Sequence, residues 1–297
     1  MSYSFHVPII AHKTFTIKKK VNKDIDKQTH MCYFKSTETN VYKTNKSKRY
    51  NKSTKEKRRI KIMSYIVINK ITLSGANQER IEEVFNFFKG VNGDMDFNKI
   101  ITMPEELVHT RKGSREDEAW ACFLAKELGN NKEIDELLTL DWVMEAGITV
   151  REKLVEYLEK IHEQDEKTCP EELKTGFATL FDYGKYQYEL QKKYGYRNHV
   201  DWALDNWGSS WNAFDIEKEE NTLKFTTYTS SIGNLMLATS AKFPDVNIVY
   251  EFCSQDLEGV GRLTIKAGKM VSVLFPNAGT EKQLELATEI LGYRPEI

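Results

Sequence analysis

The pattern of apolar and polar positions predicts a β-strand followed by an amphipathic helix soon after residue 63. Residues 64–75 are rich in β-branched side chains, alternate in part and end in Ser-Gly, which is typical of a strand. The next apolar residues recur at the spacing of one helical face, and they are Ile81, Val84, Phe85 and Phe88. An ordered strand–helix unit is therefore expected to begin here.

The segment that follows predicts a turn, a short extended piece around "FNKII" (97–101) and a helix that starts near Pro104. Asp94, Asp96 and Asn98 alternate in a way that superficially suggests a calcium loop. The glycine at the sixth place and the glutamate at the twelfth place of such a loop are missing. A plain turn is the preferred interpretation.

From about residue 105 to 196 the pattern is helical and strongly charged, and it predicts four or five short helices. One of them should bury the face formed by Ala119, Phe123, Leu124 and Leu128. Pro170 and Gly195 are typical of the beginning and the end of the last long helix. No fixed period recurs, so a solenoid is not expected.

The last hundred residues predict strands at 222–230, 245–255, 259–269 and 269–276. A helix at 231–244 should bury Ile232, Leu235, Met236 and Thr239, and a final helix should be capped by Thr280 with Gln283 at the third position. The order of these elements predicts an α+β fold of the ferredoxin-like, split βαβ type. Its antiparallel sheet is expected to carry helices on one face, with a helical subdomain inserted at about 105–196.

Composition narrows the class of protein. The chain has 297 residues, 40% of them hydrophobic, which is enough for a sizeable core. The longest apolar runs are far shorter than a membrane span of about 18 residues, and no secretory signal pattern is present. The four cysteines are scattered without metal-ligand spacing. We therefore expect a cytoplasmic protein with reduced thiols, without a cofactor, a bound metal or contact with a membrane.

Charge divides the chain into two opposite parts. Residues 1–62 contain 17 Lys and Arg against 4 Asp and Glu, a net charge of +13, and residues 63–297 carry a net charge of −14. The basic part has no apolar period and predicts a disordered leader, a real basic arm for an anionic surface, or an over-extended gene start. Two consecutive arginines precede Met63, and their codons can form a bacterial ribosome-binding sequence at the usual distance from a start codon. Met63 is therefore the expected start of translation, and residues 63–297 are the expected domain.

The stretch "DNWGSSWNAFD" (205–215) is chemically the richest in the chain. Its candidate residues for a binding pocket or a structural corner are Asn206, Trp207, Gly208, Trp211 and Asn212. Two indoles and two amides could stack and hydrogen-bond a base, a nucleotide or a peptide. The same residues could instead turn a helix into a sheet, because glycine permits a positive φ and asparagine bonds local backbone. The second interpretation is preferred.

Catalytic constellations are weak. His199, Asp201 and Asp205 lie close in sequence, and a His–Asp pair could act as a general base with its orienter. No obvious nucleophile or third member accompanies them, so an exposed helix start is the preferred interpretation. "GSSW" is not a nucleophile elbow, because the G-x-S-x-G pattern fails. His109 and His162 are isolated in helices that we expect to be exposed, so no metal site is assigned. No catalytic residue is assigned either, so the expected class is a binding protein rather than an enzyme.

Several motifs together resemble one known family. They are "VINKITLSG", "MDFNKIITMPEEL", "YGYRNHVDWALDNWGSSWNAFD", "LKFTTYTSS" and "AKFPDVNIVYEFCSQDLEGVGRLTIKAGK". In this order they resemble the YubB ferredoxin-like domain family, also described as phage Api-type proteins, of phages and plasmids. The resemblance implies a ferredoxin-like fold, a mobile-element origin and a start near Met63, but no catalytic residues. Tyr228 and Ser230–Ser231 stand where the family usually has a tryptophan and two prolines.

Three functions remain open. The leading hypothesis is a non-enzymatic accessory protein that binds a protein partner through an acidic surface and modulates host defence or DNA metabolism. The second is a nucleic-acid-binding sheet, disfavoured by the acidic charge, whose stacking aromatics would be Phe225, Tyr228, Tyr250 and Phe252. The third is a small hydrolase or transferase that uses His199, Asp201 and Ser209.

Overall fold

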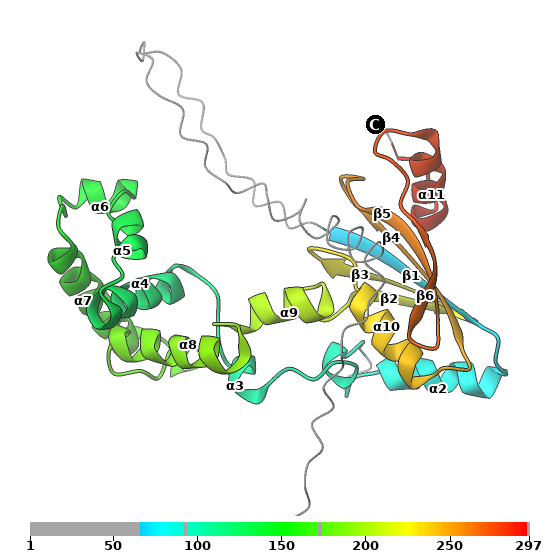
Figure 1. Ribbon diagram of the computed structural model, residues 1–297, viewed down its shortest axis with the longest axis horizontal. Helices are drawn as coiled ribbons and strands as arrows, with labels where there is room; N and C mark the ends of the chain where they lie inside the picture. The colour runs from blue at the N-terminus through cyan, green and yellow to red at the C-terminus, as the bar shows by residue number, and fades with distance from the viewer. Residues whose placement is uncertain (1–65, 92–93, 172–173, 296–297) are drawn as a thin grey trace, which may run out of the picture. The chain divides into compact units, whose positions relative to one another are not determined.

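The computed structural model describes residues 66–91, 94–171 and 174–295. The expected basic leader (1–62) and the expected start at Met63 lie outside these residues. The described chain is a mixed α+β structure with a six-stranded sheet and several helices (Figure 1). The strands are β1 (Ile66–Ser74), β2 (Phe214–Glu219), β3 (Thr222–Tyr228), β4 (Asn247–Ser254), β5 (Val260–Lys266) and β6 (Lys269–Leu274).

The sheet has the strand order β2-β3-β1-β4-β5-β6, and every pair of neighbours is antiparallel. Since β1 is antiparallel to both β3 and β4, these two strands are parallel to each other with β1 between them. Helix α10 (Gly233–Lys242) connects them. At the other end of the sheet, β5 and β6 form a hairpin through Ala267 and Gly268, which both have positive φ, the geometry that tight hairpins favour.

The remaining helices mostly lie between β1 and β2 in sequence (Figure 1). They are α2 (Gln78–Phe88), η2 (Phe97–Lys99, a 3₁₀ turn), α3 (Glu105–Val108), α4 (Ser114–Leu128), α5 (Lys132–Leu137), α6 (Asp141–Glu145), α7 (Arg151–Thr168), α8 (Leu180–Tyr194) and α9 (His199–Trp207). Helix α11 (Glu281–Leu291) follows the last strand. Helices α3 to α8 occupy the segment in which the sequence predicts four or five short helices.

Both faces of the sheet carry helices, which corrects the expectation of helices on one face. On β4 the side chains of Tyr250 and Phe252 pack in the main core together with α2 and α10. The next residue, Cys253, points to the opposite face, where it packs in a smaller cluster with Leu286 and Ile290 of α11. Because successive strand side chains alternate between faces, a strand buried at nearly every position must be covered on both.

The helical segment α4–α8 has a core of its own, to which Cys122, Leu154, Leu158 and Leu180 contribute. Polar side chains fix its helix ends. The carboxylate of Glu159 accepts hydrogen bonds from the backbone N–H groups of Leu180 (2.9 Å) and Phe181 (3.3 Å), two of the otherwise unpaired donors at the start of α8.

Some expectations from the sequence were wrong. His162 is buried, and its Nε2 lies 3.0 Å from the carbonyl oxygen of Phe177, although an exposed position was expected. The "FNKII" segment forms a 3₁₀ turn rather than an extended piece, because the side chain of Asp96 caps the N–H of Asn98. Leu128 is exposed, unlike the other three residues of its expected face.

Candidate functional site

The "NWGSSWNA" motif joins the end of α9 to the edge strand β2. Trp207 is buried, and its indole Nε1 donates a hydrogen bond to the backbone oxygen of Ile101 at 2.8 Å. Its ring makes edge contacts with Phe97 and Trp202 at centroid distances of 5.9 and 5.4 Å. A buried indole needs a partner for its N–H, and this one finds it in the segment just before α3.

The neighbouring polar residues also bond within the chain. The side-chain oxygen of Asn212 accepts the N–H of Phe97 at 3.0 Å, and the amide of Asn206 donates to the carbonyl of Trp202 at 2.9 Å. Gly208 ends α9 with φ of +86°, and a Cβ at this position would lie 2.0 Å from the backbone oxygen of Ser231. Trp207 and Asn212 thus attach the end of α9 and the start of β2 to residues 97–101, Gly208 lies close against the loop before α10, and Asn206 bonds within α9 itself.

Trp211 is the exception, because 57% of its side chain is exposed. Its ring lies 5.2 Å from that of His199, whose pKa is lowered by burial, so the imidazole is neutral near pH 7. Asp201 bonds Lys112 and Asn198, while Ser209 is buried and donates to the carbonyl of Trp211. Within the described residues, no hydrogen bond joins His199, Asp201 and Ser209 to one another.

The four aromatic residues expected to stack bases do not form an exposed platform, which corrects that expectation. Phe225, Tyr250 and Phe252 are buried in the main core. The hydroxyl of Tyr250 donates to the side chain of Asn69 (2.6 Å) and accepts the N–H of Ile232 (2.8 Å). Tyr228 is half-buried and stacks on Phe214 at 4.7 Å. A base could reach the three buried rings only after the core opened.

A row of charged side chains crosses the other face of the sheet. Five residues share one register across five strands: Glu217 (β2), Lys224 (β3), Lys70 (β1), Glu251 (β4) and Arg262 (β5). We call these five residues the charged row. Glu251 is almost fully buried and accepts both Arg262 (Nε to Oε1, 2.6 Å) and Lys70 (3.3 Å). Arg262 also bonds Glu289 of α11, so the row anchors that helix to the sheet.

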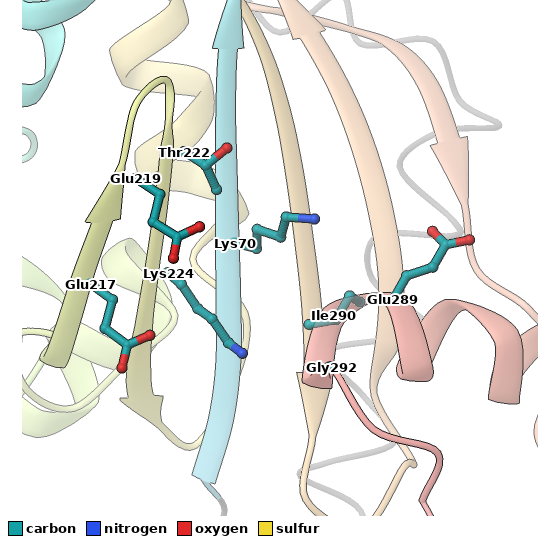
Figure 2. A pocket seen from close by; sticks show the side chains of 8 residues that line it. All are labelled: Lys70, Glu217, Glu219, Thr222, Lys224, Glu289, Ile290 and Gly292. Atoms are coloured by element: carbon teal, nitrogen blue, oxygen red, sulfur yellow. The ribbon is translucent and has the colours of Figure 1, made fainter.

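Beside the end of α11, the charged row borders a hollow of about 210 Å³ (Figure 2). Its lining consists of Lys70, Glu217, Glu219, Thr222, Lys224, Glu289, Ile290 and Gly292. Figure 2 shows the two lysine side chains extending from β1 and β3 toward the side of α11, and the carboxylates of Glu217 and Glu219 reaching from β2. The hollow therefore presents both signs of charge and one apolar wall, Ile290.

Comparisons with known proteins place few constraints on this chain. No family model matches it. No curated protein matches it. Among solved structures it is similar to a protein api92 from Yersinia pseudotuberculosis, described with the family-model DUF1281. That similarity has 14% sequence identity and a TM-score of 0.29, and covers 73% of this chain and 99% of the other. A match at this level defines neither the fold nor the function of the present chain.

The described part of the chain offers few groups for other chemistry. In it, no group of three or more His, Cys, Asp or Glu side chains is arranged to hold a metal ion. None of the described helices has the length and apolar character needed to cross a membrane. Cys122 and Cys253 are buried, and burial raises the pKa of their thiols to about 12 and about 11, which makes both poor nucleophiles.

Sequence reasoning missed the hollow entirely. The only early signal was the alternation in "INKIT" and "LKFTT", which places Lys70 and Lys224 opposite their apolar neighbours. That alternation does not reveal that the two lysines are directly opposed, because the register between β1 and β3 depends on pairing across about 150 residues of sequence.

Proposed function

We propose that the protein is a non-enzymatic protein-binding module whose helical segment α3–α8 presents negative charge to a basic partner. Residues 105–194 contain 21 Asp and Glu against 13 Lys and Arg, so this segment supplies more than half of the negative charge of residues 63–297. Such a concentration steers and selects a partner of opposite charge.

The observation that carries the proposal is a set of carboxylates left available on this segment. They are exposed and form no ion pair within residues 66–91, 94–171 and 174–295: Glu127, Glu136, Asp141, Glu145 and Glu189. Other carboxylates on the same helices are already neutralised, such as Glu156 by Lys160 (3.0 Å) and Glu163 by Lys167 (2.6 Å). The unpaired set can therefore meet a partner without first breaking an internal contact.

The proposal includes a place for the chain among the YubB ferredoxin-like proteins of phages and plasmids, as a cytoplasmic accessory of host defence or DNA metabolism. The motifs quoted above support it. So does the strand order β2-β3-β1-β4, in which β1 and β2 run parallel around β3, and β3 and β4 run parallel around β1. Two interleaved βαβ units of this kind are the ferredoxin-like arrangement, extended here by β5 and β6.

Affinity purification from host cells with two matched variants tests the proposed function. Asp141→Asn with Glu145→Gln removes two unpaired charges, and Glu156→Gln with Glu163→Gln removes two paired ones. We expect a basic protein that is retained at low salt by the unmodified chain and by the second variant. The first variant should weaken its binding by up to about tenfold. No salt-sensitive partner, or equal loss in both variants, would reject the proposal.

A further inference from the structure

Lys224 stands in an electrostatically unusual position. Its Cα partner on the neighbouring strand is Lys70, so two like charges face each other across β1 and β3, an arrangement that destabilises a sheet. Lys70 is compensated by Glu251 at 3.3 Å. Lys224 forms no ion pair within the described ranges, and its Nζ only donates a 3.3 Å hydrogen bond to the carbonyl of Leu291 at the end of α11.

The hollow offers this lysine pair a small, bounded space. The two ammonium groups and the hydroxyl-bearing Thr222 line it together with Ile290 and Gly292 from the end of α11. Its volume of about 210 Å³ is smaller than the roughly 300–1,000 Å³ of drug-sized pockets. It therefore suits a ligand of a few heavy atoms, and a nucleotide would not fit.

The charges around the hollow further restrict the kind of ligand that it can bind. Glu217 and Glu219 on β2 also line the hollow, as does Glu289 on α11, which is paired with Arg262. A ligand with several negative charges would meet these three carboxylates, and a simple cation would meet the lysines. A molecule that carries one carboxylate and one ammonium satisfies both sets through charge-assisted hydrogen bonds.

We propose that this hollow binds a small zwitterion of the free amino acid class, with its carboxylate at Lys70 and Lys224 and its ammonium at Glu217 and Glu219. The site lies on strands β1, β2 and β3 and does not use the carboxylates of the helical segment. It is therefore independent of the proposed protein-binding function, and either can fail alone.

The test is to titrate the 297-residue chain with small ligands and to measure binding by calorimetry and by changes in amide chemical shifts. The probes are glycine, 4-aminobutyrate, acetate and methylammonium. We expect at least one of the two zwitterions to bind about tenfold more tightly than acetate or methylammonium, with shifts at β1 and β3. If neither zwitterion binds more tightly than acetate and methylammonium, the proposal is overturned.

Two variants and a control test which side chains bind the carboxylate and the ammonium of the zwitterion. Lys224→Met should weaken zwitterion binding about tenfold, whereas Lys269→Met, which removes an exposed lysine of β6 outside the hollow, should not. Glu217→Gln with Glu219→Gln should reduce the affinity for the zwitterion to that for acetate, without weakening acetate itself. Circular dichroism confirms that each variant is folded. Tight binding that persists in folded Lys224→Met would overturn the assignment.

Discussion

Gly208 is a residue at which backbone conformation and packing both exclude a side chain. Its φ is +86°, and a Cβ would lie 2.0 Å from the oxygen of Ser231. Gly195 ends α8 with a similar φ of +83°, but a Cβ there would have no heavy atom within 4 Å. Substituting alanine at each of these two glycines therefore separates the free-energy cost of the left-handed conformation from that of a steric clash.

We predict that Gly195→Ala lowers the free energy of unfolding by about 1 kcal/mol and Gly208→Ala by about 3 kcal/mol or more. Urea unfolding followed by tryptophan fluorescence and circular dichroism measures both values. Similar losses in the two variants would mean that the loop at Ser231 moves away freely, and that the motif does not hold it.

The sequence singled out the residues of the "NWGSSWNA" motif without distinguishing their surroundings. Trp207 and Trp211 both stand between small or polar residues in the sequence, yet Trp207 is buried and Trp211 is largely exposed. The difference arises from Ile101, whose carbonyl accepts the indole N–H of Trp207 from 106 residues away. His162 was misjudged for the same reason, since its partner at Phe177 belongs to the loop before α8.

At the scale of elements, the hydrophobic period predicted the helices that bury a single apolar face. The four residues expected on one face of α2, and those expected at 231–244, are all buried. Strand β2 was missed, because "FDIEKE" lies at an edge of the sheet with most of its side chains exposed, and its apolar alternation is limited to Phe214 and Ile216. Its existence depends on pairing with β3, including a bulge after Phe214, which propensity alone does not encode.

The short helix α3 is attached to α8 through one carboxylate, and this contact predicts a pH dependence. Glu106 lies 2.5 Å from the ammonium of Lys193 and also accepts the hydroxyl of Tyr194. These hydrogen bonds lower the pKa of Glu106 from 4.5 to about 2. A carboxyl group whose pKa is lower in the folded state stabilises the fold above its unfolded pKa, and this stabilisation is lost as the pH falls through the folded value.

Glu106→Gln should therefore show a shallower loss of stability than the unmodified protein between about pH 4.5 and pH 2, and the two curves should approach each other at the acid end. Urea midpoints measured across this range give the comparison. Glu105→Gln removes the same charge one residue earlier without that contact, and its curve should stay parallel to that of the unmodified protein. A parallel curve for Glu106→Gln would show that the contact is absent in solution.

At the scale of the whole molecule, the clearest feature of the sequence is the uneven distribution of charge along it. Residues 1–62 carry a net charge of +13 and residues 63–297 a net charge of −14, so the total of −1 conceals the contrast. The three buried rings of the sheet offer no alternative route to nucleic acid. Any affinity of the 297-residue chain for DNA should therefore reside in its basic segment.

We predict that the 297-residue chain binds a single-stranded oligonucleotide in low salt and that residues 63–297 alone do not. Each phosphate contact releases condensed counterions, so log K should fall with log salt by about 0.7 per contact on a single strand. Fluorescence anisotropy from 20 to 200 mM salt measures the slope. If residues 63–297 bound equally well, an anionic body would be attracting an anionic ligand, and the sheet would have to expose a face different from the one seen here.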